Sequence, residues 1–232
     1  ITLCLYLPAC KPETNNAPTP PQAVIDSLEP LLHTLPIKKP MVEKMPDTTT
    51  SVAFDTLLHY YKETYKVTLL KNELWWYTRK GDNALLTITR QSDKKQVVRD
   101  SLYSQWDNVS FEDYNDDGYK DILVYNHSGP RGSNSYYTLY ATDVKNKTFR
   151  QIMGFDNVVA PQIGSNGIII STGLTNSSAE YDFYKLSNYK LIKLNKATTG
   201  YPYSDDDSIT SKAFHDYDKA YAKALKLAKK YK

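Results

Sequence analysis

The sequence predicts an antiparallel all-β domain that ends in one α-helix. Short runs rich in β-branched and aromatic residues recur at roughly ten-residue spacing, and Gly, Asn and Asp residues separate them. Twenty tyrosines against nine glycines and six phenylalanines favour half-buried pleated surfaces. From residue 209 onward the apolar residues instead recur every three or four positions, which is typical of an amphipathic helix.

The expected strands follow one another as hairpins. Each has strand-forming residues bounded by polar turn residues. The segment Phe54–Tyr61 fits a helix and a strand equally well, because its apolar and polar residues match both periods. The predicted strands are 65–70, 74–78, 84–89, 96–99, 108–112, 122–125, 136–142, 149–152, 167–171, 179–184 and 190–194.

The beginning of the sequence is similar to a bacterial lipoprotein signal. An apolar run ends in Leu7-Pro-Ala-Cys10, which resembles a lipobox. We therefore interpret residues 1–10 as a truncated signal peptide with Cys10 as the lipidation site, and residues 11–51, rich in proline, as a tether. This predicts a periplasmic or outer-membrane protein that meets the membrane through its lipid anchor only. The alternative is that the first residues form a buried apolar strand.

Residues 52–208 form the predicted β domain, and residues 209–232 form the predicted helix. One face of this helix carries an expected apolar stripe, and the rest is rich in lysine, with seven lysines against two aspartates. We predict that the helix packs on the sheet as a lid; the alternative is a basic surface facing anionic lipid or an acidic partner. Nucleic acid is not an expected partner, because basic and aromatic residues do not interleave on the β domain. The expected stripe consists of Phe214, Tyr217, Tyr221, Leu225 and Ala228.

An acidic loop between two predicted strands indicates a calcium site. Asp113, Asn115 and Asp117 place oxygen side chains at positions 1, 3 and 5, the pattern with which proteins bind Ca²⁺. Gly118 lies at position 6, where a positive φ is expected. The backbone carbonyl of Tyr119 and the carboxylate of Asp121 complete the predicted ligands.

The loop differs from an EF-hand in its ending and in its flanks. Position 12 is Val124 rather than a bidentate glutamate, and the flanking residues predict strands rather than helices. The sequence therefore predicts a strand–calcium loop–strand unit. The alternative is a polar hairpin turn that binds no metal, since a tight hairpin needs only the Asp-Gly pair.

The same residues carry a resemblance to a known family. The run from Asp113 to Leu123, the Gly129-Pro-Arg-Gly-Ser loop and the later Tyr181-Asp-Phe-Tyr strand are similar to periplasmic calcium-binding lipoproteins with a small β-propeller-like domain. That family includes immunity proteins that inhibit lysozyme-like glycoside hydrolases delivered by type IV secretion. More distantly, the loop resembles FG-GAP and VCBS repeats. In the family position 4 of the loop is usually Phe, whereas here it is Asp116, and whether Asp116 binds calcium is left open.

The resemblance implies a monomeric calcium-binding protein that inhibits a cell-wall hydrolase. Gly129, Arg131 and Gly132 are the expected partner-binding residues, because arginine on a glycine-hinged loop can reach paired carboxylates bidentately; the alternative is an ordinary turn. We expect no catalytic activity, since the four histidines form no close-spaced pair and the sequence contains no glycine-flanked nucleophilic serine motif. The rival interpretation is a calcium-stabilised module that binds protein or glycan in the cell envelope, the glycan through Trp75, Trp76 and Tyr77.

Overall fold

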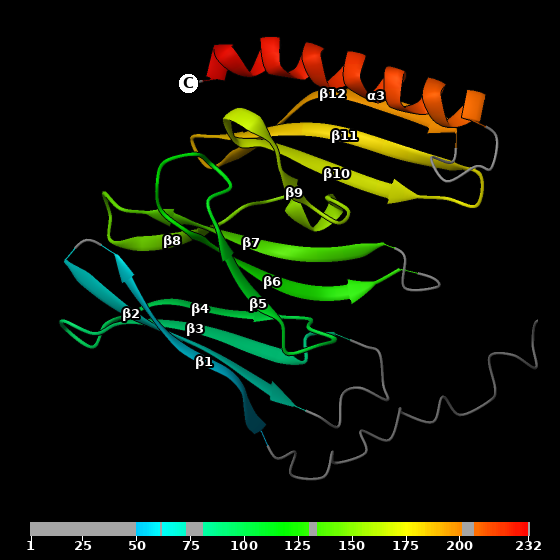
Figure 1. Cartoon of the computed structure of the whole chain (residues 1–232). Helices are drawn as coiled ribbons and strands as arrows, with labels where there is room; N and C mark the ends of the chain where they lie inside the picture. Colours follow the sequence, from blue (N-terminus) through cyan, green and yellow to red (C-terminus); the bar gives the residue numbers. More distant parts are fainter. Residues whose placement is uncertain (1–49, 61, 73–80, 130–133, 201–206, 232) are drawn as a thin grey trace, which may run out of the picture. The chain divides into compact units, whose positions relative to one another are not determined.

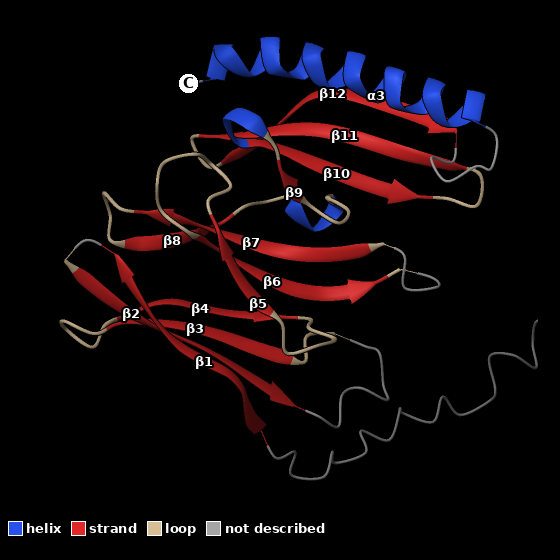
Figure 2. Ribbon diagram, viewed as in Figure 1, coloured by secondary structure: helices blue, strands red, loops and turns tan. Residues whose placement is uncertain are grey.

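Three antiparallel sheets and one long helix make up the described part of the chain (Figure 2). The structure, a computed structural model, describes residues 50–60, 62–72, 81–129, 134–200 and 207–231. The first sheet contains β1 (Thr50–Tyr60), β2 (Glu63–Asn72), β3 (Ala84–Arg90) and β4 (Gln96–Leu102). The second contains β5 (Val109–Glu112), β6 (Asp121–Ser128), β7 (Ser135–Asp143) and β8 (Thr148–Gln151). The third contains β9 (Gln162–Ile163), β10 (Ile168–Leu174), β11 (Ser178–Ser187) and β12 (Lys190–Gly200).

Helix α3 (Asp207–Ala228) follows the third sheet. Short 3-10 turns are η3 (Phe155–Asn157), η4 (Ser165–Gly167) and η5 (Lys229–Tyr231). In each sheet the strands pair in chain order, so each sheet is a four-stranded meander. The prediction of an all-β domain with a C-terminal helix is confirmed. The meanders follow one another as propeller blades do, but the described residues form no closed propeller.

The ambiguous segment after the predicted tether is a strand. Phe54 pairs with Leu69 and Leu58 with Tyr65, so this segment forms the edge strand β1 of the first sheet. Because β1 begins at Thr50, the tether boundary predicted at residue 51 lies two residues too late. Residues 1–49, which include Cys10 and the rest of the tether, lie outside the described residues, as does the predicted strand 74–78 with Trp75, Trp76 and Tyr77.

Two apolar cores lie between consecutive sheets. The first core joins Leu69 and Leu86 of the first sheet to Ile122 and Tyr140 of the second. The second core joins the other face of the second sheet, at Leu139, to the third sheet. Because the second sheet is covered on both faces, β6 is buried from Asp121 to Tyr125 without alternation. This burial explains the continuous apolar run that follows the acidic loop.

Helix α3 packs on the third sheet, with most of its contacts to β12, as Figure 1 shows. The prediction that the helix packs on the sheet is therefore confirmed. The prediction that Phe214 belongs to its buried stripe is wrong. Phe214 is 58% exposed. The buried stripe is centred on small side chains, which let the helix approach the sheet closely, and Tyr217, Tyr221 and Leu225 pack beside it. The buried alanines are Ala213, Ala220, Ala224 and Ala228. No described helix has an apolar stretch long enough to cross a bilayer.

The close approach of helix and sheet gives a first testable prediction. Ala224→Leu is expected to lower the free energy of unfolding by about 1–3 kcal/mol, because Ala224 is fully buried against the sheet and a larger side chain overpacks the contact. Ala222→Leu is the matched control, since Ala222 lies on the same helix and is exposed. Urea denaturation of both variants measures the difference. Equal stability of the two variants would contradict the observed packing.

Candidate functional site

The acidic loop lies between β5 and β6, whose last paired residues are Glu112 and Asp121. Side-chain oxygens within the loop turn inward and accept backbone N–H groups of the loop itself. Asp113 accepts from the amides of Asp117 at 3.1 Å and Gly118 at 2.8 Å. Asn115 accepts from Asp117 at 3.1 Å, and Asp117 accepts from Tyr119 at 2.9 Å. The three alternate oxygen-bearing side chains are thereby gathered on the inside of one turn.

Two residues of the loop have left-handed backbone conformations. Gly118 has φ +85°, as its place at position 6 predicts. Asp116 has φ +63°, a conformation that Asp and Asn adopt more readily than most residues. These two reversals let the chain close around the side chains of positions 1, 3 and 5.

Asp121 is fully buried and ties the loop to the second sheet. Its carboxylate accepts hydrogen bonds from the backbone N–H groups of Tyr114 at 2.9 Å and Thr142 at 2.8 Å. Burial is the main reason that the pKa of the Asp121 carboxyl is raised to about 7; the charges of Asp117 and Asp113 act in the same direction, and the two backbone hydrogen bonds oppose the rise. A cation close to this carboxyl would favour its ionised form.

The residues of the loop fit a hard cation by their chemistry, because carboxylate, amide and carbonyl oxygens are the ligands that Ca²⁺ prefers. The predicted ligands differ in how free their side chains are to turn toward an ion. Asp121 is fully buried and holds two buried backbone amides, whereas Asp113, Asn115 and Asp117 are half-buried or exposed and accept only amide groups of the loop itself. These three side chains are therefore the ones best placed to turn toward an ion. Across the described residues, no three His, Cys, Asp or Glu side chains form a metal-holding group by themselves.

Asp116 contacts the third sheet. Its carboxylate lies 4.0 Å from the Nζ atom of Lys185, a buried lysine that also donates to the carbonyl of Asn166 at 2.7 Å. A Cβ atom added at Gly167 would come within 2.6 Å of the Asp116 Cβ, which shows how closely the loop approaches this turn. This geometry favours a role for Asp116 in joining the loop to the third sheet over a role as a calcium ligand.

A cavity of about 300 Å³ lies beside the loop, between the β1–β2 and β7–β8 hairpins. Its walls are connected to the loop, because Tyr60 and Thr142 both donate to the carbonyl of Lys120. The Tyr60 ring also contacts the Tyr119 ring edge-on at 6.2 Å. Sequence reasoning missed this cavity, since it requires the strand assignment of β1. Its lining residues are Tyr60, Lys62, Glu63, Tyr65, Thr142, Asp143, Val144 and Lys147.

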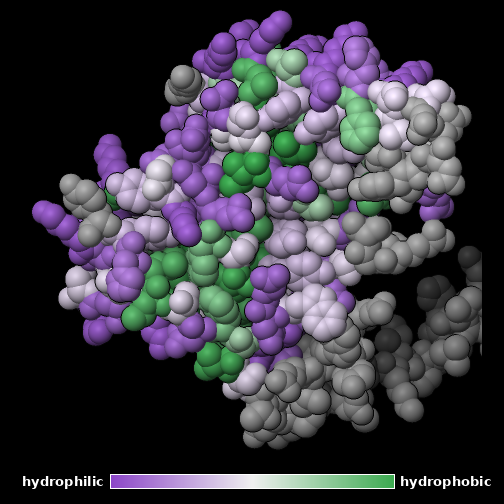
Figure 3. All heavy atoms as spheres, viewed as in Figure 1, coloured by the Kyte–Doolittle hydropathy of each residue, from purple (hydrophilic) through white to green (hydrophobic). Residues whose placement is uncertain are grey.

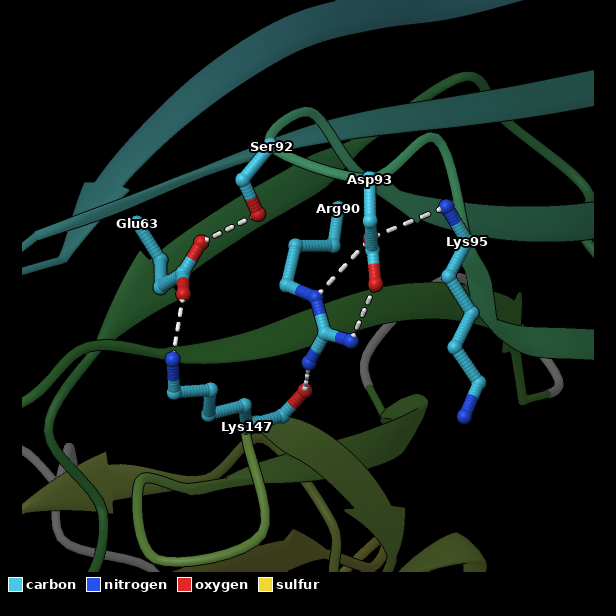
Figure 4. Close-up of polar contacts among 6 residues, drawn as sticks. All are labelled: Glu63, Arg90, Ser92, Asp93, Lys95 and Lys147. Atoms are coloured by element: carbon cyan, nitrogen blue, oxygen red, sulfur yellow. Dashed lines mark hydrogen bonds and ion pairs between the residues drawn. The ribbon is translucent and has the colours of Figure 1, made fainter.

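Polar contacts near the rim of this cavity connect the ends of three hairpins (Figure 4). Lys147 pairs with Glu63 at 2.6 Å, and Ser92 donates to the same carboxylate at 2.7 Å. Arg90 pairs with Asp93 and also donates to the carbonyl of Lys147 at 3.3 Å. Such exposed ion pairs contribute little to stability, so we interpret them as aligning the hairpins.

Of the predicted partner-binding residues, only Gly129 is among the described residues, and it follows the other end of β6. This strand begins at Asp121 and ends at Ser128, so Gly129 and the acidic loop lie at opposite ends of β6. The amide of Gly129 donates to the carbonyl of Asn134 at 2.6 Å and closes the base of the loop. Arg131 and Gly132 lie outside the described residues. Near the base, the rings of His127 and Tyr136 are stacked with their centroids 4.8 Å apart.

Comparison with known proteins identifies no family for this chain. No model of a known protein family matches the chain, and no curated protein matches it significantly. A solved structure described as "Structure of a Xanthomonas Type IV Secretion System related protein" is similar over 68% of this chain and 88% of that chain. The sequence identity is 17% and the TM-score is 0.43. At these values the similarity supports no conclusion about function.

Proposed function

We propose that this chain is a calcium-binding protein in which one ion stabilises the β5–β6 loop. The supporting observation is the inward arrangement of Asp113, Asn115 and Asp117, which gathers three hard oxygen ligands on one turn. The carbonyl of Tyr119 and the carboxylate of Asp121 are the remaining proposed ligands. The ion would neutralise carboxylates that otherwise repel one another, and its binding energy would add to folding stability.

We further propose that the protein is lipid-anchored in the bacterial periplasm and inhibits a cell-wall hydrolase. The support is the family resemblance of the calcium loop and of the aromatic strands that follow it, so this is a proposal by analogy. In this proposal the Gly129–Gly132 loop enters the cleft of the hydrolase, and Arg131 pairs with its catalytic carboxylates. The alternative proposal is a calcium-stabilised envelope module that binds protein or glycan without inhibiting an enzyme.

An inhibition assay separates these two proposals. The chain, with calcium present, is added to a panel of lysozyme-like muramidases, and the release of soluble fragments from peptidoglycan is measured. We expect saturable inhibition of at least one enzyme. Retention of the chain on peptidoglycan with undiminished hydrolysis by every enzyme would favour the alternative.

A substitution tests the role of the loop in inhibition. Arg131→Ala is expected to weaken inhibition by roughly ten-fold or more, because loss of a bidentate arginine is among the costliest changes at an interface. Arg99→Ala, at an exposed position of β4, is the matched control and should inhibit as the unchanged chain does. Equal inhibition by both variants would exclude Arg131 from the interface.

A further inference from the structure

The exposed side of helix α3 carries a straight stripe of lysines. Lys212, Lys219, Lys223 and Lys226 are all exposed. At 3.6 residues per turn they fall within an arc of about 60° around the helix axis and extend over about 20 Å along it. In Figure 3 hydrophilic residues gather along the edge of the molecule that α3 occupies. Lys230, in the turn η5, continues the stripe by one more turn.

The charge of this lysine stripe is only partly offset by the acidic residues of the helix, of which Asp216 lies four residues after Lys212 and three before Lys219. None of the salt bridges in the described parts of the chain involves a lysine of α3. Helix α3 contains three aspartates, Asp207, Asp216 and Asp218, and residues 209–232 hold seven lysines against the last two of them. Lysines in the last turn also interact favourably with the helix dipole, but Lys212 and Lys219 lie far from that turn. The stripe therefore concentrates positive charge beyond what helix stability requires.

The apolar side of α3 is already used within the domain. Ala220, Ala224 and Ala228 are buried against the third sheet, with Tyr217 and Tyr221 beside them. The helix therefore cannot insert an apolar face into a bilayer, as an isolated amphipathic helix does. A partner of this surface must be attracted by charge and must accept a flat, extended contact.

We propose that the lysine stripe of α3 binds the surface of a membrane that contains anionic phospholipid. Lysine ammonium groups on flexible stems act as point charges and suit a fluid array of phosphate groups. A folded acidic protein would more often be recognised with aromatic and arginine anchors, and no aromatic or arginine side chain is part of the stripe. The contact is peripheral and adds to any lipid anchor, and it requires neither calcium nor a hydrolase.

Vesicle binding tests this proposal directly. The 232-residue chain, prepared without lipid modification, is sedimented with vesicles of phosphatidylcholine alone or with one third phosphatidylglycerol. The test variant carries Lys219→Gln, Lys223→Gln and Lys226→Gln. The control carries Lys62→Gln, Lys95→Gln and Lys145→Gln, which remove the same charge from exposed sites in the hairpin turns of the first two sheets. Circular dichroism verifies that both variants fold.

We expect binding that depends on the anionic lipid and on the stripe. Each lysine near such a surface contributes roughly five-fold in partitioning, so the test variant should bind about a hundred-fold more weakly than the control. Binding should also fall as salt shortens the Debye length from about 10 Å at 0.1 M to about 3 Å at 1 M. Equal binding by the two variants, or equal binding to both kinds of vesicle, would overturn the proposal. The proposal would also be overturned if the lysine stripe were needed for binding to polyglutamate but the chain did not bind vesicles. That result would indicate an acidic protein partner.

Discussion

Replacing Asp121 by alanine is expected to lower the free energy of unfolding by roughly 2–6 kcal/mol. The carboxylate is fully buried and accepts the amides of Tyr114 and Thr142, so its removal leaves two buried N–H groups without a partner. Each such group costs roughly 1–3 kcal/mol. Urea denaturation measures the effect, with Asp156→Ala as an exposed control. A loss no greater than that of the control would contradict the role of Asp121.

The isosteric substitution Asp121→Asn is also expected to lower the free energy of unfolding. Asp121→Asn keeps the shape of the side chain, but its NH₂ group must then face the amide of either Tyr114 or Thr142, and two donors cannot satisfy each other. We therefore expect Asp121→Asn to lose most of the stability that Asp121→Ala loses. Full stability of the asparagine variant would mean that the carboxylate accepts only one of the two amides in solution.

Removing calcium is expected to lower the melting temperature by roughly 5–10 °C. Saturation at a hundred times the dissociation constant adds about 2.7 kcal/mol of stability, and a domain of this size shifts by roughly 2–4 °C per kcal/mol. Thermal melts with calcium and with excess chelator measure this shift. The dependence on calcium, rather than the melting temperature itself, is the diagnostic quantity, because a substitution in the loop can also change the stability of the metal-free protein.

Neighbouring aspartates of the loop provide a matched pair for this measurement. Asp117→Ala should abolish the calcium-dependent shift, because it removes the ligand proposed at position 5. Asp116→Asn should retain the shift, because Asp116 lies against Lys185 and asparagine tolerates the same positive φ. Loss of the shift in Asp116→Asn alone would reverse the roles assigned to these residues.

The fold was predictable wherever local pattern and burial agree. The alternation of Tyr65, Val67 and Leu69 with more exposed residues identified β2, because one face of the first sheet is buried. The apolar run of β6 was also recognised, although both of its faces are covered. By contrast, β1 was ambiguous because its identity depends on pairing with β2, which is a tertiary contact. Phe214 was misplaced because hydrophobicity favours a large side chain, whereas the close contact with the sheet selects alanines.

The loop's residues and its glycine were predictable, but its connections were not. Alternate oxygen side chains and Gly118 follow from spacing alone, since they act within one turn. The contact of Asp116 with Lys185 joins the β5–β6 loop to the third sheet. The periodicity of a sequence does not predict contacts of this kind. The amide of Thr142 reaches Asp121 from the neighbouring strand β7 of the same sheet, and the sequence pattern does not predict this contact either. These long-range contacts distinguish the buried carboxylate of Asp121 from the carboxylates whose hydrogen bonds stay within the loop.

Calorimetric titration of the chelator-treated chain with CaCl₂ tests the proposed calcium site most directly. We expect one ion per chain for the unchanged protein and for Asp116→Asn, and no binding for Asp117→Ala. Absence of any binding heat at millimolar calcium, confirmed by equilibrium dialysis, would contradict the proposal and leave the β5–β6 loop as a hairpin turn held by its own hydrogen bonds.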